Sequence, residues 1–391
     1  MNRILAIISV CISLIGCQKE VQIQEEQEFG KLISYPEDII AHNAKLSNPY
    51  FSYFLRDGDS YYFAYMDNDI EFKHKLPYHS FLNSDSSRTY YGIHDGFHFD
   101  HISQTVYFTT REEFYQYPVT AGSVTEKYFL QSFDLSTDTI TWKREIDFSG
   151  VSHVNLTNYW DLPGVCDGKL IMIYMGGSTT DLYRFEPSSG QLIDSIQGSA
   201  YDWLETSEVR NDTLHLTRSS PWGYHRICDC SFNSISTQIF GEDILLESHG
   251  FFVDDQHLIY PGVTYGNGTK NMLAIYDFDS GLDTVLHEYE DLKYSIQKVL
   301  KMDNGNFALL GSIAPADGIG TTVFFNQNSL FIGEYDIANN RLISHKTYSF
   351  NNGFMLTDAH YMGGSTFSVI GRQGSLHESQ KGHCRFTFTL K

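Results

Sequence analysis

The densest cluster of groups that could hold a metal ion lies between residues 94 and 101, where three histidines and two aspartates occur. Neutral imidazoles and carboxylates are common ligands of zinc and iron. On a strand, His94 and His98 would share one face while His101 points to the other. One hypothesis is therefore a metal site at His94 and His98. The alternative is chance, because no His-Glu-x-x-His spacing accompanies them, and no cofactor is evident.

A second group of candidates combines large aromatic side chains with carboxylates. Such rings can stack on sugar faces or anchor a protein partner, and the acids can accept hydrogen bonds from a ligand. The alternative is that the rings pack between structural units, which is the commonest use of large aromatic residues. The predicted ligand site consists of Trp160, Asp161, Tyr201, Asp202, Trp203, Trp222, Tyr224 and His225.

Motifs of specific catalytic chemistry are absent from the sequence. No Gly-x-Ser-x-Gly marks a hydrolase nucleophile, and Gly318-Ile319-Gly320 lacks the rest of a dinucleotide-binding fingerprint. Two classes of function remain. One is a non-catalytic module that binds a glycan, peptide or protein, and the other is a hydrolase or lyase that uses a His and Asp cluster, with or without a metal. The lack of catalytic motifs favours the binding module.

The N-terminus carries a signal for covalent lipid attachment. Arg3 is followed by an apolar stretch from Ile4 to Ile15, which is too short to span a bilayer. The stretch ends in Gly16-Cys17, where the small glycine permits peptidase access and the cysteine sulfur accepts diacylglycerol. Residues 1–17 are therefore predicted to be a lipoprotein signal with an anchor at Cys17, because several acyl chains hold a protein stably on a membrane. An ordinary signal peptide with a chance cysteine is the alternative.

Charge limits the possible partners. Residues 18–28 are rich in acids and poor in apolar residues, which predicts a flexible tether. The whole chain has 27 Lys and Arg against 48 Asp and Glu, a net charge of −21, which becomes −22 when Arg3 leaves with the signal. Nucleic acid is disfavoured as a partner, because its binding requires clustered cations.

The elements that must position these residues are repeated hairpins. Five residues each end an apolar run and stand 52, 45, 46 and 59 residues apart: Phe133, Phe185, Cys230, Tyr276 and Tyr335. An acid follows all of them except Cys230, which Ser231 follows, and a turn-forming residue stands five positions after four of the five. Roughly 40 to 50 residues is the length of one four-stranded propeller blade. The repeats therefore predict an all-β chain.

The ends of the chain determine the number of blades. The apolar run from Leu170 to Tyr174 does not alternate with polar residues, which is typical of a strand packed on both faces. Residues 48–75 contain three short runs of a first blade, and residues 355–390 contain three strands of the last one. Residues 31–35 are predicted to add the fourth strand to the last blade. The prediction is one seven-bladed β-propeller over residues 29–391, with six blades as the alternative.

This exported, acidic repeat chain resembles the uncharacterised β-propeller lipoproteins of Bacteroidota. The resemblance is carried by Cys17, by the Lys19-Glu20 pair that follows it, and by the hairpin repeats. It implies a lipid-anchored protein of the cell envelope at the outer membrane, with the periplasmic or outward orientation open, and it brings no catalytic residues. For Lys19-Glu20, a plain acidic linker is the alternative to a surface-export signal.

Four cysteines remain after Cys11 is removed with the signal and Cys17 is lipidated: Cys166, Cys228, Cys230 and Cys384. An exported protein can form disulfides. Cys228 and Cys230 lie two apart on a predicted strand and point to one face, which is poor geometry for bonding each other. We therefore expect buried thiols.

Overall fold

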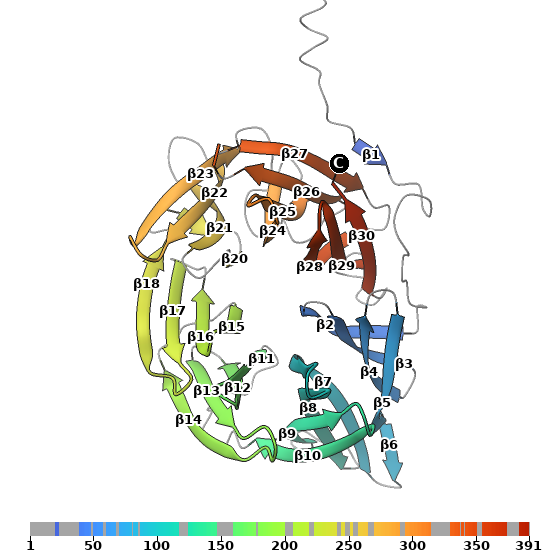
Figure 1. Ribbon diagram of the computed structural model, residues 1–391. Coiled ribbons are helices and arrows are strands. Elements are labelled where there is room, and N and C mark those ends of the chain that lie inside the picture. Colours follow the sequence, from blue (N-terminus) through green and yellow to red (C-terminus); the bar gives the residue numbers. More distant parts are fainter. Residues whose placement is uncertain are drawn as a thin grey trace, which may run out of the picture. The chain divides into compact units, whose positions relative to one another are not determined.

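The structure is a computed structural model. It describes residues 20–22, 39–47, 50–57, 60–67, 70–79, 81–84, 87–116, 124–146, 159–176, 179–199, 206–218, 223–240, 244–246, 251–252, 257–264, 270–289, 294–313, 329–336, 338–339, 341–349, 354–373 and 383–390. Every regular element in these ranges is a β-strand, and the strands form seven sheets (Figure 1). They fall into two compact units, Tyr35–Val285 and Met1–Ser34 with Leu286–Lys391.

The Tyr35–Val285 unit begins with two antiparallel sheets. The first has the order β2-β3-β4-β5 and consists of β2 (Ile39–Ser47), β3 (Tyr50–Asp57), β4 (Ser60–Asp67) and β5 (Ile70–His79). The second has the order β10-β9-β8-β7-β6 and consists of β6 (Phe81–Ser84), β7 (Ser87–Asp100), β8 (Thr105–Gln116), β9 (Val124–Asp134) and β10 (Thr139–Ile146).

Three further sheets follow in the same unit, except that the last strand of the fifth sheet extends beyond its boundary at Val285. The third consists of β11 (Tyr159–Cys166), β12 (Lys169–Gly176), β13 (Thr179–Phe185) and β14 (Leu192–Ser199). The fourth consists of β15 (Thr206–Arg210), β16 (Thr213–Arg218), β17 (Gly223–Asp229) and β18 (Ser234–Phe240). The fifth consists of β19 (Ile244–Leu246), β20 (Phe251–Phe252), β21 (His257–Thr264), β22 (Lys270–Asp277) and β23 (Leu282–Tyr289).

The other unit contains two sheets. The sixth sheet has the order β1-β27-β26-β25-β24 and consists of β1 (Glu20–Gln22), β24 (Tyr294–Lys301), β25 (Phe307–Ile313), β26 (Ser329–Asp336) and β27 (Arg341–Ser349). The seventh consists of β28 (Phe354–Gly363), β29 (Thr366–Gln373) and β30 (His383–Thr389). The all-β class and the number of seven repeat units are thus confirmed.

The predicted closing strand and the N-terminal strand that the structure describes are different segments. Residues 31–35 lie outside the described part of the chain. The N-terminal strand that the structure does describe is β1, within the segment predicted to be a tether, and it pairs in parallel with β27 of the sixth sheet. The seventh sheet has three strands among the described residues.

Strand β12 shows why the apolar runs are continuous. All five residues from Leu170 to Tyr174 have no exposed surface. Leu170, Met172 and Tyr174 belong to one apolar cluster, while Ile171 and Ile173 belong to another. Because successive side chains of a strand point to opposite faces, each face of this sheet fills a different core.

The acids of the repeat close its hairpin turns. A carboxylate oxygen of Asp134 accepts a hydrogen bond from the Ser136 backbone N–H at 2.8 Å, and Asp277 accepts one from the Asp279 N–H at 2.8 Å. Such a side chain substitutes for a backbone acceptor in the turn. The bonds lower the pKa of both carboxyls below the usual range, with the Ser136 and Ser280 bonds as the largest causes. In the predicted hairpin after Tyr276, Gly281 has a φ of 67°, as the turn requires.

The fourth sheet follows the same rule once its register is known. Asp229 accepts hydrogen bonds from the Ser231 and Asn233 N–H groups at 2.8 Å each. Cys228 pairs with Leu214, just as Phe133 pairs with Val106. The residue that ends the apolar run is therefore Cys228, not Cys230, and the exception at Ser231 disappears.

Candidate functional site

Strands β7, β11 and β15, from three successive sheets, approach one another closely. A Cβ added to Gly96 on β7 would lie 2.7 Å from the Trp160 carbonyl oxygen on β11, so only glycine fits there. A Cβ added to Gly164 on β11 would lie 3.5 Å from His98 Cε1 and 3.6 Å from Val209 Cβ on β15. Gly96 thus lets the backbones of β7 and β11 approach closely, and Gly164 lies in contact with the side chains of His98 and Val209. We call this the three-strand contact.

The three-strand contact carries polar side chains. Asp161 on β11 is 7% exposed, and the Ser207 hydroxyl on β15 donates a hydrogen bond to its Oδ2. His98 on β7 is half-buried, and its ring stacks at 6.3 Å on Tyr107. Burial alone would raise the pKa of Asp100, but hydrogen bonds from Ser103 and Ile102 and the charge of His98 together lower it. An imidazole, a carboxylate and a hydroxyl therefore lie along one short stretch of β11.

The contact does not form a metal site within the described residues. No three His, Cys, Asp or Glu side chains gather there, or elsewhere in the part of the chain that the structure describes, to hold a metal ion. The side chain of His94 lies outside the described residues. The predicted pair of His94 and His98 therefore stays a prediction, with only His98 placed.

Trp160 fills the core and does not offer its ring to a ligand. It is 1% exposed, and its ring lies 4.4 Å from that of Tyr174 and 5.9 Å from that of Tyr128. Strand alternation explains the difference from its neighbour, because Trp160 points into the apolar cluster while Asp161 points to the opposite face. Trp160 therefore packs in the core, which was the alternative interpretation of this ring, and its predicted contact with a ligand is corrected.

The remaining predicted ligand residues divide into two groups. His225 on β17 has no exposed surface, so it too is a core residue and not a surface contact. The backbone of Tyr224 lies in β17, but its side chain is outside the described residues. Four others lie outside the described part of the chain altogether: Tyr201, Asp202, Trp203 and Trp222.

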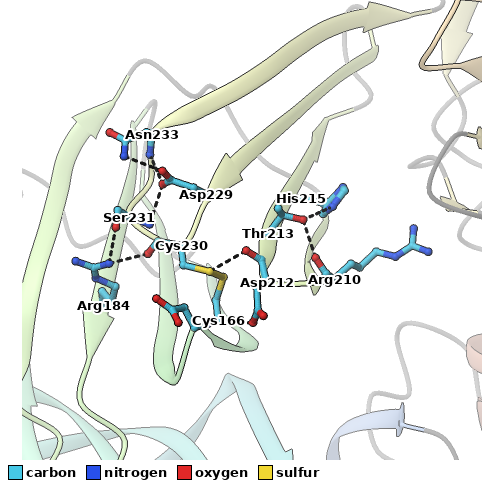
Figure 2. The surroundings of a disulfide bond; sticks show 11 residues. Cys166, Arg184, Arg210, Asp212, Thr213, His215, Asp229, Cys230, Ser231 and Asn233 are labelled. Atoms are coloured by element: carbon cyan, nitrogen blue, oxygen red, sulfur yellow. Dashed lines mark hydrogen bonds between the residues drawn. A yellow bond between two sulfur atoms is a disulfide. The ribbon is translucent and has the colours of Figure 1, made fainter.

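His225 belongs to a buried histidine pair that sequence reasoning missed. Its Nε2 lies 3.1 Å from Nδ1 of His215, which is 8% exposed. Thr213 Oγ1 donates to the Arg210 carbonyl oxygen at 2.6 Å, so it accepts from His215 Nε2 at 2.9 Å (Figure 2). With both rings neutral, His215 Nδ1 accepts the proton of His225 Nε2. The chain of bonds thus defines both tautomers.

The pair departs from the repeat, which is the signal that could have revealed it. With Cys228 as the reference, His225 occupies the position three residues earlier, where the other repeats have Leu130, Leu182, Leu273 and Ile332. Burial, His215 and Arg210 lower the pKa of His225 to about 3, so the ring is neutral. Its ring lies 4.6 Å from that of Phe278, in the turn after β22.

A disulfide joins the third and fourth sheets, where sequence reasoning expected buried thiols. Cys166 at the end of β11 bonds Cys230 after β17, across 64 residues (Figure 2). Cys228 is a buried free thiol, as expected, and burial raises its pKa. Cys228 lies in β17, whereas Cys230 lies in the turn that follows this strand. Only the folded register shows which cysteine meets Cys166.

The three-strand contact holds hydrogen-bonding groups in fixed positions. The Ser207 hydroxyl donates to Asp161 and so keeps this carboxyl in place as an acceptor. The contact can therefore present hydrogen-bonding groups to a ligand.

Comparison with known proteins gives similarity of structure alone. No family model matches the chain, and no curated protein matches it. A chain in the crystal structure of the mitotic checkpoint complex has 11% identity and a TM-score of 0.50, covering 96% of this chain and 97% of its own. The WD40 β-propeller domain of Doa1 has 12% identity and a TM-score of 0.47, covering 92% and 96%. BamB from Moraxella catarrhalis has 11% identity and a TM-score of 0.46, covering 92% and 99%.

The chain is a seven-bladed β-propeller. This class is consistent with a binding module. Among the residues that the structure describes, none belongs to a helix that could cross a membrane.

Proposed function

We propose that this protein is an exported, lipid-anchored β-propeller of the cell envelope that binds a ligand without catalysis. The observation that carries the binding role is the three-strand contact, where Asp161 is fixed by Ser207 and His98 is half-buried. A protein or peptide is the favoured ligand, since the similar chain with a TM-score of 0.50 comes from a complex. A glycan is the other ligand class that the sequence suggests.

Anchoring is proposed from Cys17, and the location follows from it. The resemblance to Bacteroidota β-propeller lipoproteins supports the outer membrane as the site of attachment. Cys17→Ser should move the protein from the membrane to the soluble fraction after cell fractionation. Cys11→Ser is the matched control, because Cys11 lies inside the apolar stretch and should leave attachment unchanged. Equal membrane retention of the Cys17→Ser variant contradicts the proposed anchor.

Ligand binding is tested by photo-crosslinking in intact cells. A benzoylphenylalanine at position 98 should capture a discrete adduct, because a half-buried position is reached only by a ligand that enters the contact. The same group at Ile102, which is 85% exposed, reports random collisions. Identical adducts at both positions contradict the proposed site. Stoichiometric zinc, iron or calcium in the purified mature protein would instead favour the hydrolase or lyase.

A further inference from the structure

Strand β1 ties the start of the mature chain to one edge of the sixth sheet. Glu20, Val21 and Gln22 pair in parallel with Thr347, Tyr348 and Ser349 of β27 (Figure 1). Strand β27 is otherwise the last strand of the β24–β27 sheet. The pairing therefore occupies an edge that would present unpaired backbone groups.

The pairing shortens the distance between the propeller and the predicted lipid anchor. Glu20 is three positions after Cys17, and an extended chain spans at most about 11 Å over that length. Adding one strand spacing leaves Thr347 within about 16 Å of the Cys17 Cα. Among the described strands, the next one after β1 is β2 at Ile39, and an extended chain from Cys17 to Ile39 would reach about 75 Å.

We infer that the β1-paired edge of β27, from Thr347 toward Arg341, is the membrane-facing surface of this protein, with the lipid bilayer as its partner. Strand β1 runs parallel to β27, so its N-terminal end, which leads to Cys17, points toward Arg341. The inference rests on the proposed lipid anchor at Cys17. Acyl chains on Cys17 hold this residue at the bilayer surface. The short chain between Cys17 and β1 then keeps β27 close to the bilayer. The β1 pairing thus sets an orientation of the sheet, whereas a free tether would permit any.

The charges of β27 suit this placement. The chain carries a net charge of −21, which opposes approach to anionic lipids. Strand β27 offers two cations, Arg341 with a side chain that is 68% exposed, and Lys346, whose Nζ donates to the Thr389 carbonyl oxygen at 3.4 Å. Ile343, between them, is 48% exposed. Cations and an aliphatic side chain on one strand match the headgroup region.

Energy transfer from the protein to the bilayer tests the orientation. The lipidated protein is reconstituted into phosphatidylethanolamine and phosphatidylglycerol vesicles that carry an acceptor dye on the headgroups. A donor is attached in turn at Thr347→Cys, Ile343→Cys and Met362→Cys, and the parent protein gives the background from Cys228 and Cys384. Ile343 and Met362 are similarly exposed, at 48% and 46%. All three positions lie in one compact unit.

Transfer should be highest at Ile343 and lower at Thr347 and Met362. Ile343 lies on the Arg341 side of Thr347, four residues along the strand, about 13 Å. Met362 is next to Tyr361, which bonds Asp303 in the turn between β24 and β25, three strands across the sheet and about 14 Å or more from β27. Equal transfer at the three positions, or the highest transfer at Thr347 or Met362, overturns the inference.

Breaking β1 supplies the matched test. Val21→Pro removes a backbone donor and should abolish the difference between the three labels, while Val21→Thr preserves a strand-forming residue and should retain it. Both variants should stay in the membrane fraction. A difference that survives Val21→Pro overturns the role of β1. Release of the protein by Cys17→Ser is measured in parallel, so that failure of the anchor is distinguished from failure of the orientation.

Discussion

The two faces of the fourth sheet are filled in opposite ways. Toward the third sheet, Leu214, Leu216 and Cys228 pack with Ile171 and Leu182 in an apolar cluster. On the opposite face, His215 and His225 share a hydrogen bond, and His225 lies against Phe278. The register equates His215 with Ile171, and His225 with Leu182. Position in the repeat therefore determines burial, while polarity depends on whether a hydrogen-bond partner is within reach.

The largest expected effect is on acid stability. The pKa of His225 is about 3 in the folded protein, against an unfolded value of 6.5, so only the unfolded chain takes up the proton between these values. His225 therefore leaves the free energy of unfolding unchanged above pH 6.5. Below that pH the free energy of unfolding decreases by about 1.4 kcal/mol per pH unit, a total of about 5 kcal/mol near pH 3. Chemical denaturation at several pH values measures this slope.

The control for acid stability is a variant with the apolar pair of the neighbouring sheet, His215→Ile with His225→Leu. The turn carboxylates, whose pKa values are also lowered, lose their contribution at lower pH in both proteins. The difference between wild type and variant therefore isolates the histidines. The same pH dependence of the free energy of unfolding in wild type and variant above pH 4 would show that protonation of the pair does not affect stability.

Loss of the disulfide should have the next largest effect. Replacing Cys166 and Cys230 by alanine frees a loop closed across 64 residues, which should lower the free energy of unfolding by about 4 kcal/mol. Cys228→Ala, at the neighbouring free thiol, is the matched control and should cost less. The midpoint of denaturation, measured with and without reductant, reports the change. Insensitivity of the wild type to reductant would contradict the bond.

Smaller effects distinguish a broken pair from a replaced one. His225→Leu alone removes the donor to His215 Nδ1 and should cost about 1 to 3 kcal/mol at pH 7. The double variant with His215→Ile should be close to neutral, because both polar groups leave together. A double-mutant cycle measures the coupling. Simple additivity of the two single changes would mean that the rings do not act as a pair.

The smallest expected effect lies outside both cores, in the hairpin turns. Asp229→Ala and Asp277→Ala each remove hydrogen bonds to turn N–H groups, so each should lower the melting temperature slightly and by a similar amount. Differential scanning calorimetry compares them. A much larger decrease for Asp229→Ala would mean that its turn supports the nearby Cys230 as well as the hairpin.

The fold was predictable because its signals are local. A hairpin needs only a strand-forming run, a turn acid and a glycine in reach of one another, as in Tyr276, Asp277 and Gly281. Continuous apolar residues from Leu170 to Tyr174 indicated burial on both faces, which the two clusters confirm. The ends of the chain were sufficient to count seven units.

The candidate site was predictable only in part, because its contacts join different repeats. Asp161 was recognised as a carboxylate beside aromatic rings, but its partner Ser207 stands 46 residues away. For Trp160 the sequence left ligand contact and core packing as alternatives, because a ring at the end of a loop and a ring in a core have the same composition. The alternation of side chains along β11 distinguishes the two environments, and this alternation depends on where the strand begins.

The sequence by itself therefore determined the strand class, the turn acids and the candidate anchor at Cys17 from short local patterns, and the number of repeat units from the recurrence of those patterns along the chain. Only the tertiary structure decided that Cys166 meets Cys230, that His225 meets His215, and that β1 pairs with β27. These contacts depend on register and on the approach of separate sheets. A shift of one residue reverses which face a side chain occupies, and no local pattern specifies that shift.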